Sequence, residues 1–128
     1  MKNVLRAVSG LFGLLFLVSA IRWIVDPAAA AEGLGMPLLD GVGRSTQIGD
    51  IGAFFVLAAA LILAGTLREN ATLLRTAGLL LASAAVLRTI AWMAHGAPPA
   101  TAFIAVEVGV AVLLVGTASQ FSSSGSSD

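Results

Sequence analysis

Long apolar runs, separated by short breaks of polar residues, glycine or proline, dominate the pattern along the chain. They cover approximately residues 7–25, 45–67, 72–95 and 101–118. Each run is of the length needed to cross a hydrocarbon layer of about 30 Å, which takes about 20 helical residues. Apolar residues surround each predicted helix instead of forming one stripe, which is typical of helices that face lipid. The pattern predicts an all-α integral membrane four-helix bundle with up-down-up-down topology.

The first run shares features with a cleaved signal peptide, because it follows basic residues and precedes four alanines. In a signal peptide, however, an apolar core of about 7–15 residues is followed closely by the cleavage site. Here the segment Ile21–Pro27, which contains Arg22 and Asp26, lies between the apolar core and the alanines. We therefore expect a retained first span.

The connection after the first run is long and contains its own helix signals. Asp26 is a good N-cap and Pro27 suits the first helical position, so a short interfacial helix is expected from Pro27 to about Glu32. The connection has about 18 residues, and connections of that length are usually functional or disordered. Its leucines and methionine make it too apolar for free disorder. Two interpretations stay open, a flap over the outer mouth of the bundle and a surface helix on the lipid headgroups.

Composition supports the membrane assignment, since 58% of the residues are hydrophobic and 11% are charged, against about 25% charged residues in a soluble domain. The formal net charge is zero, which argues against a nucleic-acid partner. The absence of cysteine excludes disulfides, thiol catalysis and cysteine metal sites. We expect one membrane domain over residues 1–121 and a disordered serine-rich tail over residues 122–128.

Basic residues predict the orientation. Cytoplasmic loops of membrane proteins carry an excess of lysine and arginine. With the N-terminus inside, more of the basic residues lie at the cytoplasmic ends of the runs than at the outer ends, so both termini are expected in the cytoplasm. The basic residues expected on the cytoplasmic side are Lys2, Arg6, Arg68 and Arg75.

Charged residues inside the runs are the candidate functional chemistry. Counting from the outer ends of the runs at 1.5 Å per residue places Arg22, Asp50, Arg88 and Glu107 in one layer, about 6–11 Å below the outer edge. Charges within a membrane are costly and are functional candidates by default. We therefore expect Asp50, Arg88 and Glu107 to meet in one interior cluster.

Helical spacing adds neighbours to this cluster. Arg88, Trp92 and His95 lie on one side of the third predicted helix, and Gln47 shares a face with Asp50. The aromatic rings of Trp92, Phe54 and Phe103 are expected to border the cluster. The candidate ligand-binding residues are Gln47, Asp50, Arg88, Trp92, His95 and Glu107.

Several interpretations of the cluster stay open. It can be a structural ion network in which Asp50 and Glu107 clamp Arg88, while Arg22 pairs with Asp26. It can also be an enzyme site in which Asp50 and Glu107, with pKa values pushed apart, act as acid and base in an isomerase, cyclase or hydrolase. A third alternative is a small proton-coupled transporter. A metal site is not expected, because Arg88 lies among the candidate ligands, and no feature names a cofactor.

A resemblance accompanies these features. The first span ends in Asp-Pro, and an arginine late in the third span and a glutamate in the fourth complete the pattern. The segments Gly33–Leu38 and Gln47–Phe55 belong to the same pattern, and Gln47–Phe55 is its most specific part. The chain thus resembles a family of small bacterial four-helix integral membrane proteins of unknown function that is distantly similar to DoxX-like proteins. The resemblance implies a multi-pass protein of the bacterial inner membrane and brings no established activity.

The leading hypothesis is a small membrane protein that binds a lipophilic molecule with a polar head in the outer half of the bundle. The molecule would be a membrane lipid, a quinone or an isoprenoid. Arg88 would hold an anionic or carbonyl oxygen, while Asp50 and Glu107 would accept hydrogen bonds or balance charge. A role as a subunit of a larger membrane complex or as a homo-oligomer is equally compatible with the sequence.

Overall fold

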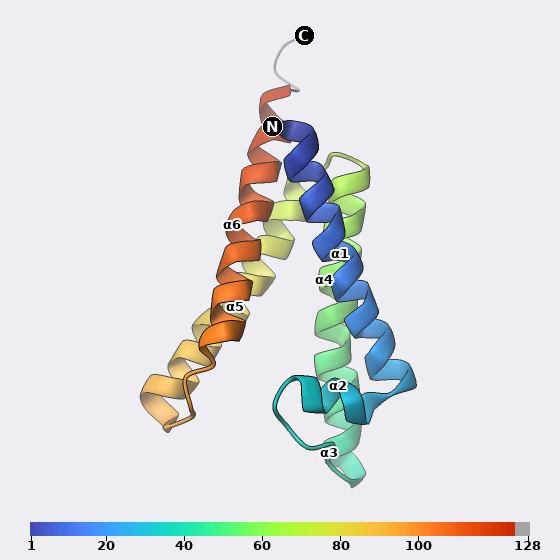
Figure 1. The fold of residues 1–128 in the computed structure, drawn as a ribbon, viewed down its shortest axis with the longest axis vertical. Helices are drawn as coiled ribbons and strands as arrows, with labels where there is room; N and C mark the ends of the chain where they lie inside the picture. The colour runs from blue at the N-terminus through green and yellow to red at the C-terminus, as the bar shows by residue number, and fades with distance from the viewer. Residues whose placement is uncertain (125–128) are drawn as a thin grey trace.

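The computed structural model describes residues 1–124, and over that range every regular secondary-structure element is a helix (Figure 1). The long helices are α1 (Lys2–Val25), α4 (Gly52–Leu67), α5 (Ala71–His95) and α6 (Thr101–Ser124). The shorter elements are α2 (Pro27–Gly33), α3 (Gly41–Thr46) and η1, a π-helical turn (Gln47–Ile51). Helix α6 continues to Ser124, into the segment expected to be a tail, and residues 125–128 of that segment lie outside the described residues.

The predicted all-α fold with four membrane-crossing helices is confirmed. Elements α3, η1 and α4 follow one another without a break, so the second span is 27 residues long and starts at Gly41, four residues earlier than predicted. Within the described residues, four helices are long and apolar enough to cross a membrane. Successive long helices run in opposite directions, so the start of α1 and the C-terminal end of α6 lie at the same end (Figure 1). We call this end the terminal end, and the opposite end, which carries α2 and α3, the distal end.

Helix boundaries follow local sequence signals. The carboxylate of Asp26 accepts a hydrogen bond of 3.1 Å from the backbone N–H of Ala29, which caps α2. The amide oxygen of Asn70 accepts one of 3.1 Å from the N–H of Leu73 and caps α5 in the same way. Gly96 ends α5 in the left-handed conformation, with φ of 67°, which glycine adopts at little cost. The predicted short helix after Asp26 is therefore present, one residue longer than expected.

The helices pack most tightly in the half of the bundle near the terminal end. A hydrophobic core there joins α4, α5 and α6; its buried members are Ile62, Leu74, Ala77, Leu81, Val110, Ala111, Leu114, Ala118 and Phe121. Helix α1 comes close to α4 at Gly13, where an added Cβ would lie 2.7 Å from a side-chain carbon of Leu63. Helix α1 also meets α6 through a buried hydrogen bond of 2.9 Å between the hydroxyls of Ser9 and Thr117. Small residues and one hydroxyl pair thus allow close helix contact, as is common in lipid.

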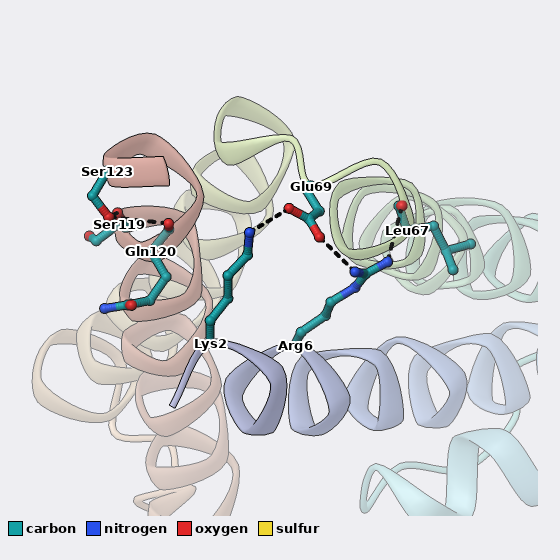
Figure 2. Close-up of polar contacts among 7 residues, drawn as sticks. All are labelled: Lys2, Arg6, Leu67, Glu69, Ser119, Gln120 and Ser123. Carbon is teal, nitrogen blue, oxygen red and sulfur yellow. Dashed lines mark hydrogen bonds and ion pairs between the residues drawn. The ribbon is translucent and has the colours of Figure 1, made fainter. Parts of the chain in front are cut away.

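An ion cluster closes the terminal end (Figure 2). The carboxylate of Glu69, in the turn between α4 and α5, lies 2.7 Å from Lys2 Nζ and 2.6 Å from Arg6 Nη1. The hydrogen bond from Lys2, together with the positive charges of Lys2 and Arg6, holds the pKa of Glu69 below its ordinary value, although partial burial opposes the shift. Glu69 also has a positive φ of 51°, an unfavourable conformation for a side chain other than glycine. The two ion pairs fasten α1 to this strained turn.

Toward the distal end the bundle opens. Helix α1 packs along α4, and α5 packs along α6, and these two pairs diverge from the terminal end downward in Figure 1. A second cluster forms on the α1–α4 side, where Trp23 packs with Ala30 and Ala31 of α2. The first connection therefore packs against one pair of helices.

Candidate functional site

A hollow of about 340 Å³ lies between the two pairs of helices, and we call it the central hollow. Helices α1, α4, α5 and α6 and the end of α2 all contribute to its wall. The lining residues are Phe12, Leu15, Phe16, Ser19, Gly33, Leu34, Phe55, Arg88, Phe103, Val106 and Glu107. The wall is apolar apart from one hydroxyl and one pair of charges, which is the usual character of a site for a lipophilic molecule.

The pair of charges consists of Arg88 on α5 and Glu107 on α6. Arg88 Nε donates a hydrogen bond of 2.9 Å to Glu107 Oε1, and the guanidinium carbon lies 4.8 Å from the centre of the Phe103 ring. The Glu107 side chain is 9% exposed and that of Arg88 is 33% exposed. The predicted partnership of these two residues is present, and Phe103 borders it as expected.

Both members of the pair have unused hydrogen-bonding capacity. Among the described residues, Arg88 donates only through Nε, so its two terminal nitrogens are available to another acceptor. The second carboxylate oxygen of Glu107 is buried and has no hydrogen-bond partner within the described chain. An unpaired buried polar atom is costly and calls for an explanation in each case. The arrangement offers guanidinium donors to an oxygen atom in an otherwise apolar wall.

A second, smaller hollow of about 110 Å³ adjoins the first. It is lined by Ser19, Arg22, Trp23, Ala30, Gly33, Leu34 and Phe55. Arg22 makes no hydrogen bond or ion pair through its side chain with any described residue, and Asp26, its expected partner in an ion network, caps α2 instead. The second hollow is therefore bordered by an unpaired guanidinium.

Asp50 does not join the pair of Arg88 and Glu107. It lies on η1, is exposed, and forms no ion pair with a described residue. It is also not part of the wall of the central hollow. The physical reason is the opening of the bundle, because η1 belongs to the α1–α4 side whereas the pair belongs to α5 and α6. The expected cluster of three charges is thus a cluster of two.

Gln47 holds the first connection. It is 7% exposed, and its amide oxygen accepts a hydrogen bond of 2.7 Å from the N–H of Leu39. Its amide nitrogen donates to the carbonyl of Pro37 at 3.0 Å and to the sulfur of Met36 at 3.1 Å. These three bonds use both ends of the amide, so the structure gives Gln47 a positioning role at the start of the π-helical turn.

The remaining predicted residues lie on α5 near the distal end. Trp92 is 47% exposed and His95 is also exposed, and neither lines the central hollow. An exposed tryptophan near a helix end is typical of the membrane interface. Among the described residues, no group of three His, Asp or Glu side chains is placed to hold a metal ion.

Sequence reasoning missed the apolar wall. Phe12, Phe16 and Ser19 of α1 are spaced four and three residues apart, so they share a helix face, and Phe55 of α4 contacts Phe16 with ring centres 5.8 Å apart. The spacing was visible in the sequence. It had no distinguishing chemistry, because aromatic and apolar residues occur on every face of these helices.

Comparisons of the chain with protein-family models, with curated proteins and with solved structures find no match. The two hollows and the charges that line them are the features that bear on function.

Proposed function

We propose that this protein binds a lipophilic molecule with a polar head in the central hollow. The observation that carries the proposal is the pair of Arg88 and Glu107 set in an apolar wall that is formed by all four long helices. The apolar wall suits hydrocarbon, and the free guanidinium nitrogens of Arg88 suit an oxygen atom of the head. Membrane lipids, quinones and isoprenoids share this combination of chemistry.

The depth of the pair makes its two charges costly. Arg88 lies seven residues before the end of α5, which corresponds to about 10 Å at 1.5 Å per residue. A charged side chain at the centre of a span costs about 2.5–3.5 kcal/mol on insertion scales. Glu107 offsets part of that cost through Nε of Arg88, and the terminal nitrogens of Arg88, which bond no described residue, remain available to an oxygen atom in the hollow. A ligand oxygen at Arg88 would accept hydrogen bonds from these nitrogens.

The enzyme alternative requires two carboxylates around one substrate. Asp50 is exposed and outside the wall, so Glu107 is the single carboxylate that lines the central hollow among the described residues. General acid and base catalysis by a pair of carboxylates has no support in this arrangement. Binding without chemistry is the function that the geometry favours.

The test compares two substitutions on α6. Val106 lines the central hollow and Val108 does not, although both side chains are about half exposed. Val106→Trp should fill the hollow and displace the ligand, whereas Val108→Trp should leave it in place. Native mass spectrometry of the protein extracted in a mild detergent should show one bound lipophilic molecule in the wild type and in Val108→Trp, and none in Val106→Trp. Equal occupancy in all three proteins, or no bound molecule in any, would overturn the proposal.

We further propose that the protein lies in a bacterial inner membrane with both termini in the cytoplasm. The support is the set of basic residues at the terminal end: Lys2 and Arg6 near the start of α1, Arg68 in the turn between α4 and α5, and Arg75 near the start of α5. The chain contains no cysteine, so single cysteines at two exposed threonines provide a matched test. In intact cells an impermeant maleimide should label Thr101→Cys, at the distal end, and spare Thr72→Cys, at the terminal end. The reverse labelling would refute this orientation.

A further inference from the structure

Arg22 is a cation without a partner beside the proposed ligand site. Its side chain is exposed, lines the second hollow, and makes no hydrogen bond or ion pair with any described residue. The nearest acid along the chain, Asp26, uses its carboxylate to cap α2. A free guanidinium at the edge of a membrane-facing depression is suited to an oxyanion, which it binds through two parallel hydrogen bonds.

The second hollow and the central hollow are parts of one depression. They share four lining residues, namely Ser19, Gly33, Leu34 and Phe55. Arg22 therefore stands at one end of a continuous surface, and the pair of Arg88 and Glu107 stands farther along it. The smaller hollow is the more polar of the two, and the larger is the more apolar.

Helical rise gives the depths of the features along this surface. Arg22 is three residues from the distal end of α1, or about 5 Å, and Arg88 is seven residues from the distal end of α5, or about 10 Å. The apolar wall continues along α1 as far as Phe12, ten residues from Arg22, or about 15 Å. This length is half of a hydrocarbon core of about 30 Å, which is the thickness of one leaflet. The depression thus has the length of the acyl-chain layer of one leaflet.

The charges that line the depression determine the preferred head group. They are two arginines and one glutamate, which sum to one positive charge. Asp26 and Glu32 lie on the neighbouring connection but line neither hollow. A head group with one negative charge balances this sum, whereas a zwitterionic head group brings a second cation next to Arg22.

We infer that the occupant is an anionic phospholipid, with its phosphate at Arg22, an ester carbonyl at Arg88 and an acyl chain along the wall from Phe16 to Phe12. This inference rests on the proposed function and specifies its ligand. The inference depends on the order of groups along the depression. From its head inward, a phospholipid has a phosphodiester, then ester carbonyls, then hydrocarbon, and the depression has Arg22, then Arg88, then the apolar wall. Arg88 suits the neutral carbonyl because Glu107 already balances its charge, while Arg22 has no such partner.

The experiment measures lipid retention by native mass spectrometry. The protein is delipidated in detergent and then titrated separately with phosphatidylglycerol, with phosphatidylcholine and with oleate. Arg22→Gln removes the proposed phosphate contact. Arg44→Gln is the matched control, because Arg44 is at the same end, pairs with Asp40 at 2.7 Å and lines neither hollow. The loss of the charge-assisted hydrogen bonds from the guanidinium should weaken binding of phosphatidylglycerol to Arg22→Gln by at least about tenfold.

The expected result is one bound phosphatidylglycerol, retained better than phosphatidylcholine or oleate, with the preference lost in Arg22→Gln and kept in Arg44→Gln. Equal binding of the two phospholipids, or an Arg22→Gln protein that binds like the wild type, would overturn the phospholipid assignment. Oleate binding as tightly as phosphatidylglycerol would overturn it as well. If such binding is nevertheless abolished by Val106→Trp, the proposed function stands and only this inference fails. If no lipid binds to any protein, both fail.

Discussion

Removing Arg88 should destabilise the protein more than removing Glu107, although the two residues form one ion pair. The asymmetry follows from burial. Glu107 has a side chain that is 9% exposed, whereas that of Arg88 is 33% exposed and also contacts the Phe103 ring. Arg88→Leu leaves a buried carboxylate without its donor. Glu107→Leu leaves a guanidinium that can turn toward the hollow and remain on the aromatic ring.

The exposed fractions of the two side chains determine how much stability each substitution should remove. Breaking a buried ion pair from one side costs about 3–5 kcal/mol. Because Arg88 is one-third exposed, we take about 3 kcal/mol for Arg88→Leu. For Glu107→Leu we expect about 1.5 kcal/mol, the value of a hydrogen bond to a charged group. Replacing both residues with leucine should restore stability to within about 1 kcal/mol of the wild type, because a buried pair is often no better than apolar packing.

The assay is equilibrium unfolding in mixed detergent micelles, followed by circular dichroism, for the two single variants and the double variant. The pair of Arg44 and Asp40 serves as a control, since its side chains are 49% and 95% exposed. Removing either of those partners should change the free energy of unfolding by less than about 0.5 kcal/mol. A Glu107→Leu protein that is as destabilised as Arg88→Leu, or more so, would refute the argument from burial.

Three further outcomes follow from the packing and the ion cluster. Gly13→Ala should lower the free energy of unfolding by about 1 kcal/mol, because the new Cβ meets a leucine carbon of α4 at 2.7 Å; Gly109→Ala, with no atom within 4 Å of its Cβ, should be neutral or stabilising in the same assay. Gln47→Leu removes the bonds to the first connection, so hydrogen exchange of the connection's amides should accelerate while that of α5 stays unchanged. Glu69 has a pKa held below its ordinary value by its bond to Lys2, so its stabilising contribution is present at neutral pH and is lost as the pH falls through that lowered value. Thermal unfolding of Glu69→Gln should accordingly depend less on pH in the acidic range than that of the wild type, and identical acid profiles would contradict this assignment.

Much of the fold was predictable because lipid imposes simple requirements on sequence. The long helices, the cap at Asp26 and the short helix α2 follow from apolar length and local chemistry, and the structure has all of them. The π-helical turn from Gln47 was not predictable. The same residues could also form an ordinary α-helical turn, so the local sequence does not distinguish the two. Its position coincides with the bonds from Gln47 to the first connection, which are tertiary contacts that no local pattern reports.

The opening of the bundle also lay beyond the sequence. Small residues such as Gly13 allow close approach at the terminal end, but similar residues occur at the distal end, where a Cβ added at Gly49 would meet no atom beyond the local helix backbone within 4 Å. Small residues therefore permit close packing without specifying where it occurs. The central hollow exists because the two pairs of helices pack closely against each other at the terminal end only.

The contrast between Glu107 and Asp50 shows when counting residues along a membrane sequence predicts a contact between two side chains. Arg88 lies seven residues before the end of α5, and Glu107 lies six residues after the start of α6, with only a short connection between the helices. A short connection makes the two helices run side by side, so nearly equal counts from it become similar depths on adjacent helices, and the side chains meet at 2.9 Å. Asp50 follows a long connection that packs against α1 and α4. The number of residues between Asp50 and the end of its span therefore predicts its depth in the membrane, but not which side chains lie beside it. Equal depth is therefore evidence of contact only across short connections. The same reasoning explains why Arg22, at the far side of that long connection, is left without an acidic partner and is available to a ligand.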